Sequence, residues 1–267
     1  MLGDRRGEGR QIPATTALRC ILAANPSPLT LDGTRTYIIG ERRIAIIDPG
    51  PSLPEHVDAL IAAAGDSEAA ILLTHQHPDH AEAADQLASA LDAPVFSAHS
   101  GLLPMRIAVG TDAGTVVAVP TPGHTPDHLA FHWPAAASVF CGDLMLGGLD
   151  TALVAPPEGD LASYLQSLHK LADLEPRRIY PAHGPPFEEP AEALARYIRH
   201  REARAAQVLE RLTRGPATAD ELLVHVYGDT IEPTLSATAA GALRAYLDHL
   251  ARQGRIEQSG ERWVLRA

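Results

Sequence analysis

Four side chains that can bind metal ions fall within six consecutive positions of this sequence: His75, His77, Asp79 and His80. They directly follow residues 71–73, an apolar run that predicts a buried strand. Neutral imidazole and carboxylate groups are ligands of zinc and other divalent transition metals. Residues two apart in an extended segment point to the same side. His75 and His77 can therefore face one point, and Asp79 and His80 a second. This spacing predicts a metal site, the alternative being a solvated histidine-rich loop.

Three later segments favour the metal site over the loop. Each places one ligand-type residue just past an apolar run that predicts a strand, beside a glycine that lets the backbone approach closely. These residues are His124, Asp143 and His183. A single histidine at the end of a strand is usually structural, but four such strand ends in one chain indicate one shared site.

The elements that must position these residues alternate between strands and helices. Apolar and β-branched runs bounded by turn residues predict strands at 36–39, 44–47, 69–73, 95–98, 115–119, 128–133, 138–141 and 178–180. Helical spacing predicts helices at 53–64, 81–91 and 161–174. Such alternation is typical of an α/β fold, in which helices pack on a sheet.

A proline-rich stretch at 185–190 predicts a boundary between two parts of the chain. We expect a mobile N-terminal segment at 1–17, a catalytic domain at 18–190 and a small domain at 191–267. The last part should contain helices at 191–213, 218–227 and 237–253, followed by a hairpin that turns at Ser259-Gly260.

The composition excludes several classes of protein. The chain has 267 residues, two cysteines and a formal net charge of −11. Two cysteines cannot form a disulfide framework, and no apolar run approaches the roughly 20 residues needed to span a bilayer. We therefore expect a cytoplasmic protein without a membrane partner. Residues 191–267 carry 11 arginines and 10 acidic residues, a net charge of +1, so residues 1–190 carry −12. This balance opposes nonspecific binding of nucleic acid.

The sequence resembles the metallo-β-lactamase superfamily, in particular its β-lactamase-like group with a C-terminal winged-helix domain. The resemblance rests on the H-x-H-x-D-H run at 75–80, the single ligands that follow, and the Asp48-Pro49-Gly50 turn. Residues 25–37 and 191–267 resemble the N-terminal signature and the winged helix of that group.

This resemblance implies an αββα sandwich with two divalent metal ions at its mouth, zinc first and manganese or iron as alternatives. It assigns one ion to His75, His77 and His124, and the other to Asp79, His80 and His183. Asp143 would bridge the two ions.

Two metal ions close together would make hydroxide available near neutral pH and polarise the group under attack. Asp79 is the expected catalytic residue, which orients that hydroxide and passes a proton to the leaving group. Asp48, Thr74 and Thr125 are expected to hold ligand rings in place, the alternative being turn or cap hydrogen bonds. His128 fits the superfamily's G-H-T-x-x-H pattern and is expected beside the site.

Other residues have weaker signals. Tyr164 and Arg35 are expected to line the pocket, from their positions alone. Arginines and glutamates alternate along 191–213, often three or four residues apart, which predicts a solvated, ion-paired helix face. The seven remaining histidines are expected on surfaces or helices outside the site: His56, His99, His132, His169, His200, His225 and His249.

Three functions are compatible with these residues. The first is hydrolysis of a small ester, thioester or lactone, which we favour, with a small-molecule acyl substrate rather than RNA as the partner. The second is cleavage of single-stranded RNA, suggested by the resemblance, because animal mitochondrial members of the group are endoribonucleases. The charge of −12 on residues 1–190 opposes it. The third is a non-catalytic winged-helix binding module, which a missing ligand would favour. The oligomeric state stays open, with a homodimer as one alternative.

Overall fold

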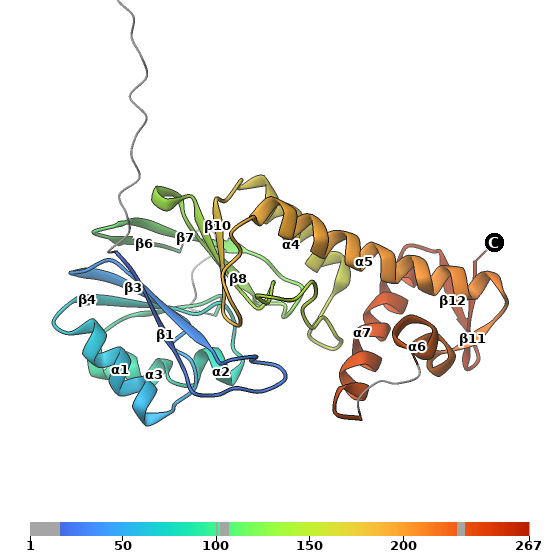
Figure 1. The fold of residues 1–267 in the computed structure, drawn as a ribbon, viewed down its shortest axis with the longest axis horizontal. Helices are drawn as coiled ribbons and strands as arrows, with labels where there is room; N and C mark the ends of the chain where they lie inside the picture. The colour runs from blue at the N-terminus through green and yellow to red at the C-terminus, as the bar shows by residue number, and fades with distance from the viewer. Residues whose placement is uncertain (1–16, 100, 102–106, 229–232, 267) are drawn as a thin grey trace, which may run out of the picture.

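Two five-stranded sheets face one another, and helices cover the outer face of each (Figure 1). The computed structural model describes residues 17–99, 101, 107–228 and 233–266, so nearly all of the predicted N-terminal segment at 1–17 lies outside the described residues. The first sheet contains, in spatial order, β1 (Leu18–Leu22), β2 (Arg35–Ile39), β3 (Arg43–Ile47), β4 (Glu68–Leu72) and β5 (Val95–Phe96). The second contains, in spatial order, β10 (Arg178–Pro181), β9 (Ser138–Gly142), β8 (Leu129–Trp133), β7 (Gly114–Pro120) and β6 (Ala108–Thr111).

The helices fall into two groups along the chain. Those of the first half are α1 (Pro54–Ala64), α2 (Pro78–Ala81) and α3 (Ala84–Leu91). Those of the second half are α4 (Leu161–Asp173), α5 (Pro190–Thr213), α6 (Ala219–Tyr227) and α7 (Pro233–Arg252). In the part of the chain that the structure covers, none of these helices could span a membrane.

Side chains of the first sheet alternate between two hydrophobic cores, because successive residues of a strand point to opposite faces. The core between the two sheets includes Ile39, Ile47, Leu72, Phe131 and Phe140. The core between the first sheet and helices α1 and α3 includes Ile38, Ile46, Ile71, Leu60 and Leu87. Burial on both faces explains why these strands are continuous apolar runs in the sequence. The predicted αββα sandwich is confirmed.

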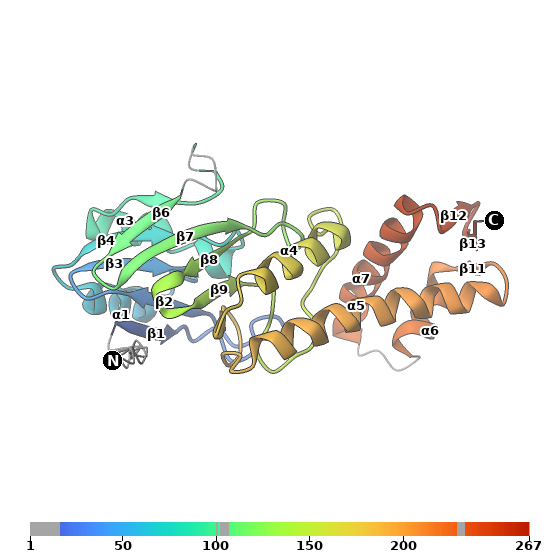
Figure 2. The same ribbon diagram turned by 90° about the horizontal axis from the view of Figure 1, so that it is seen from above.

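The C-terminal elements share a core with the second sheet. One buried cluster joins Val139 of β9 and Tyr164 of α4 to Tyr197 of α5, Tyr246 of α7 and Trp263 near the C-terminus. The small C-terminal sheet has the order β11 (Ala217–Thr218), β13 (Arg262–Leu265) and β12 (Ile256–Ser259). Helix α5 runs from the sandwich to this part, beside α7 (Figure 2).

The structure corrects three local predictions. The helix predicted at 81–91 is interrupted, because the N–H of Ala83 donates to the carbonyl of Gly50 at 3.1 Å and separates α2 from α3. Strand β6 was not predicted; it is short and contains Gly110, which has a low strand propensity. The final hairpin pairs Ser259 with Arg262, so its turn lies one residue later than predicted.

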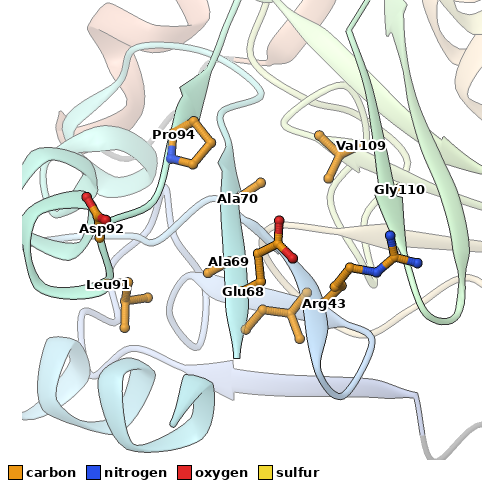
Figure 3. A pocket seen from close by; sticks show the side chains of 10 residues that line it. Arg43, Glu68, Ala69, Ala70, Leu91, Asp92, Pro94, Val109 and Gly110 are labelled. Carbon is orange, nitrogen blue, oxygen red and sulfur yellow. The ribbon is translucent and has the colours of Figure 1, made fainter. Parts of the chain in front are cut away.

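A pocket of about 390 Å³ lies where β3 and β4 begin (Figure 3). Arg43, Glu68, Pro94 and Val109 are among the residues that line it. The metal-ligand candidates follow the other end of β4, so this pocket does not belong to their site.

Candidate metal centre

The first group of candidate ligands contains His75, His77, His124 and Asp143, whose ligand atoms all lie within 4.8 Å of one another. Nδ1 of His77 lies 2.9 Å from Nε2 of His75 and 3.2 Å from Nε2 of His124. Oδ2 of Asp143 lies 3.6 Å from Nε2 of His124. Three ring nitrogens and one carboxylate oxygen therefore surround a common point.

The second group contains Asp79, His80 and His183. Oδ2 of Asp79 lies 3.3 Å from Nε2 of His183 and 3.6 Å from Nε2 of His80. Oδ1 of Asp143 lies 3.2 Å and 3.4 Å from the same two nitrogens. One oxygen of Asp143 thus faces each group, so this carboxylate is placed where it would bridge two ions.

These seven side chains meet because they follow strand ends on one side of the sandwich. His75 follows β4, His124 follows β7, Asp143 follows β9 and His183 follows β10, while the remaining ligands begin α2. Gly123 is required here. It has a φ of +138°, and a Cβ at this position would lie 2.3 Å from Cα of Tyr164. A side chain at position 123 would clash with α4, so only glycine lets the loop that carries His124 pass at this distance.

The ring nitrogens that point away from the centre have hydrogen-bond partners. Nδ1 of His80 lies 2.9 Å from Oδ2 of Asp48. Nδ1 of His124 donates to the carbonyl of Leu153 at 2.8 Å, and Nδ1 of His183 donates to the carbonyl of Gly33 at 3.1 Å. An acceptor on this side holds one proton of each ring, so the nitrogen that faces the centre is the one that can offer a lone pair to a metal ion.

Asp48 connects two of the candidate ligands, His80 directly and His75 through Thr74. Its carboxylate accepts hydrogen bonds from the backbone N–H and the hydroxyl of Thr74, both at 2.8 Å. Oγ1 of Thr74 in turn accepts from Nδ1 of His75 at 3.0 Å. Asp48 has a φ of +51°, an unusual conformation for a residue other than glycine. Asp48 thus contacts the ring of His80, and Thr74 contacts the ring of His75.

Three polar atoms at the centre are buried without a hydrogen-bond partner among the described residues: Nε2 of His80, Nε2 of His183 and Oδ1 of Asp143. Leaving such an atom unpaired costs about 1–3 kcal/mol. All three point to the position between the two groups, so a cation bound there would satisfy them. This donor set of imidazoles and carboxylates fits divalent transition metals.

The charges of these groups also suit a cation. Burial lowers the pKa of His75 and of His124, which keeps both rings neutral. Burial opposes ionisation of Asp143, but neighbouring His80 and His183 hold the pKa of that carboxyl well below its usual range. Burial likewise opposes the charge on His183, but the neighbouring carboxylates of Asp143 and Asp79 raise the pKa of His183 to about 9. Metal binding would therefore displace a proton from His183.

His128 lies beside the centre, and its ring contacts the backbone of the candidate ligand Asp143. Nε2 of His128 accepts from the N–H of Asp143 at 3.3 Å, and its Nδ1 donates to the hydroxyl of Thr121 at 2.9 Å. Burial lowers the pKa of His128 to about 3, so the ring is neutral, as this pairing requires. It therefore positions Asp143.

Three predicted contributions are not found. The hydroxyl of Thr125 is buried without a hydrogen-bond partner in the described part of the chain, so it holds no ligand ring in that way. Tyr164 donates to the carbonyl of Leu144 at 2.7 Å inside the core, and Arg35 pairs with Asp32. Neither Tyr164 nor Arg35 lines the cavity described next, so that prediction is wrong.

A cavity of about 490 Å³ opens from the centre. Its lining starts at His77, Asp79, His124 and Asp143, continues along Leu146, Leu149 and Leu153, and includes Pro28 and Leu29. Helices α5, α6 and α7 complete it with His200, Arg201, Arg204, Tyr227, Thr238, Ala239 and Ala242.

No motif in the sequence predicts that these C-terminal residues line the cavity. Arg201 is only 2% exposed, so the prediction of a uniformly solvated face on α5 is wrong at this position. His56 lies on helix α1 outside the centre, in agreement with its predicted place on a surface or a helix, and its ring is buried with Nε2 3.0 Å from the hydroxyl of Thr36. Glu158, which lies 3.0 Å from Nε2 of His77, has no signal in the sequence.

Replacing Asp48 by alanine should weaken metal binding by about 10- to 100-fold. The ring of His80 loses its acceptor, and the Thr74 hydroxyl that accepts from His75 loses the carboxylate that orients it. Competition with a chromogenic chelator measures this affinity. Asp112→Ala is the control, since Asp112 accepts two backbone N–H groups in an exposed turn away from the centre. Unchanged affinity in Asp48→Ala would contradict the role of Asp48.

Comparisons with known proteins agree with this centre. The sequence matches the metallo-beta-lactamase superfamily over residues 29–109 and 108–183. It is 32% identical to the beta-lactamase-like protein 2 homolog of Drosophila melanogaster, over 93% of this chain and 94% of that protein. A beta-lactamase domain protein from Burkholderia ambifaria has the same fold, with a TM-score of 0.78 and 22% identity over 94% of this chain and 92% of its own.

A further solved structure, in a di-iron-bound form, is 29% identical to this chain. It superposes with a TM-score of 0.53 and covers 66% of this chain and 96% of its own. The matched region contains all seven candidate ligands, and their two groups form a His/Asp cluster of the kind that binds divalent metal in this superfamily. The chain therefore belongs to the metallo-β-lactamase superfamily and is a hydrolase of that fold.

Proposed function

We propose that this protein is a dinuclear metal-dependent hydrolase that acts on a small ester, thioester or lactone. The observation that carries the proposal is the position of Asp143, which faces both ligand groups at the base of a cavity with largely aliphatic walls. His75, His77 and His124 would hold one ion, and Asp79, His80 and His183 the other. Zinc is the first candidate, with manganese or iron as alternatives.

Two divalent ions held by these residues would supply hydroxide near neutral pH and polarise the acyl oxygen. The protein contributes the orientation of the reactants and the movement of protons. Asp79 lines the cavity with a partly exposed side chain, while its Oδ2 faces His183 at 3.3 Å. It is placed to orient the attacking group and to pass a proton to the leaving group.

The cavity favours a small acyl compound over RNA. Its aliphatic walls suit an acyl chain. Residues 1–190 carry a net charge of −12, which also opposes a polyanion. A non-catalytic module is disfavoured because no ligand is missing from the two groups.

We also propose that residues 191–267 form a winged-helix-like domain that closes the cavity rather than binding nucleic acid. Helices α5, α6 and α7 contribute lining residues, which supports this role. The net charge of +1 over this part is small for a nucleic-acid-binding surface. We propose the cytoplasm as its compartment, without a membrane partner, because two cysteines cannot form a disulfide framework. A homodimer is compatible with this arrangement.

A panel assay tests the proposed reaction. Wild-type protein should hydrolyse nitrophenyl esters, a thioester or a lactone, and leave labelled single-stranded RNA intact. His77→Ala should lower kcat/KM by about 10³-fold or more, because it removes a ligand of the first ion. His169→Ala, an exposed histidine of α4, should match wild type. RNA cleavage that depends on His77, without acyl hydrolysis, would contradict the proposal.

A further inference from the structure

The wall that α5 contributes to the cavity carries three basic side chains: His200, Arg201 and Arg204. The same cavity begins at the candidate metal ligands. Arg201 and Arg204 stand three positions apart on the helix, so they lie on the same face. A basic surface therefore faces a cavity whose other walls are largely aliphatic.

Arg201 is a buried cation with neutral partners. Its Nη1 donates to the hydroxyl of Tyr246 at 3.1 Å, and its Nη2 donates to the carbonyl of Ala152. Its guanidinium carbon lies 4.9 Å from the centre of the Tyr164 ring. Its Nε has no hydrogen-bond partner among the described residues. These contacts fix the guanidinium group in place without neutralising its charge.

Arg204 also has neutral partners only, and both Arg204 and His200 have a buried nitrogen without a partner among the described residues. Arg204 donates through Nη1 to Oε1 of Gln207 at 3.1 Å and to the carbonyl of Val226, and its guanidinium carbon lies 5.0 Å from the centre of the Tyr227 ring. Nε of Arg204 and Nδ1 of His200 are both buried without a partner in the described part of the chain. Three unpartnered nitrogens thus occur on one wall.

Acidic side chains near α5 pair with other arginines. Within the described ranges, carboxylates lie at ion-pair distance from Arg196, Arg211 and Arg214, but not from Arg201 or Arg204. A buried charge without a counter-ion is unfavourable, and an anionic ligand would remove this cost.

We propose that this wall binds a carboxylate on the acyl substrate, at a position away from the bond that is hydrolysed. A planar guanidinium group matches a carboxylate through two parallel N–H···O hydrogen bonds. The inference rests on the proposed function, because it names the substrate class of the same cavity. That class is an acyl compound with an aliphatic chain that ends in a carboxylate.

Two matched series of esters test this specificity in the metal-loaded enzyme. One contains mono-nitrophenyl esters of dicarboxylic acids from succinic to suberic acid, and the other the uncharged nitrophenyl esters of equal chain length. At the chain length that reacts best, the acid-ended ester should have a kcat/KM about 10- to 100-fold higher than that of its neutral counterpart. This gain should come from a lower KM, because the carboxylate contributes to binding. Equal kcat/KM at every length would overturn the carboxylate site and leave the hydrolase intact.

Arg204→Gln should remove the preference for the acid-ended ester, measured in each protein as the ratio of kcat/KM for the acid-ended and the neutral ester. Arg204→Lys keeps the charge and should retain part of the preference, which separates loss of charge from loss of folding. Arg199→Gln is the matched control, because it removes an exposed arginine from the same helix. A preference that survives in Arg204→Gln would overturn the assignment.

Calorimetry of the same proteins with hexanoate and hexanamide separates this inference from the proposed function. Hexanoate should bind wild type at least about 10-fold more tightly than Arg204→Gln, while binding of hexanamide should not differ. If no ester is hydrolysed but this difference is found, the hydrolase proposal fails and the carboxylate site stands. Equal hexanoate binding by both proteins, or Arg204-dependent binding of single-stranded RNA in its place, would overturn the site.

Discussion

Replacing Asp143 by alanine should abolish hydrolysis and reduce the metal content from two ions per chain to one or none. Asp143 is the only one of the seven ligands with an atom facing each group: Oδ1 toward His80 and His183, and Oδ2 toward His124. Loss of the metal chemistry should lower kcat/KM by at least about 10⁴-fold, since bound ions supply several kcal/mol of transition-state stabilisation.

Metal analysis and ester kinetics measure both effects in one preparation. Asp150→Ala is the matched control, because Asp150 is an exposed aspartate that pairs with Arg196 outside the centre. Circular dichroism should show a near-native fold in both variants, because the hydrophobic cores of the sandwich do not include Asp143. A variant at Asp143 that keeps two ions and wild-type activity would exclude the bridging role.

Replacing Asp79 by asparagine should lower kcat by about 10²- to 10⁴-fold, the range for loss of a general acid–base group. Asparagine keeps the size of the side chain and one oxygen, but it cannot accept and release a proton at neutral pH. The first group of ligands does not include Asp79, so the variant should retain at least one ion per chain.

Single-turnover and steady-state kinetics, combined with metal analysis, separate the two roles of Asp79. Asp85→Asn, an exposed aspartate at the start of α3, is the control and should match wild type. Full activity in Asp79→Asn with two ions bound would mean that another group moves the proton.

The sandwich and the seven candidate ligands could be predicted because their signals are local. An apolar run such as 69–73 is buried on both faces, and each ligand follows such a run or begins the helix after it. Asp48 and Thr74 could be predicted for the same reason. The interruption between α2 and α3 could not, because it depends on a hydrogen bond from Ala83 to Gly50, more than 30 positions away.

The substrate side of the cavity has no comparable local signal. Glu158 and the carbonyl of Leu153 meet the ligand rings only after the loop that precedes α4 folds over the centre. Arg201 resembles any arginine of a solvated helix until α4 and α7 pack around it. Such contacts depend on tertiary packing, so the spacing of residues along α5 predicts the helix but not its buried charges.

In the proposed function, two groups of ligands, joined by Asp143, hold two metal ions that are needed for hydrolysis. The most direct test is the metal content of wild type and Asp143→Ala, measured on the same protein samples as ester hydrolysis, before and after chelation. We expect close to two ions per wild-type chain, loss of activity with the metal, recovery on adding zinc, and one ion or none in the variant. Folded wild-type protein that hydrolyses the ester at an unchanged rate without metal would contradict the claim.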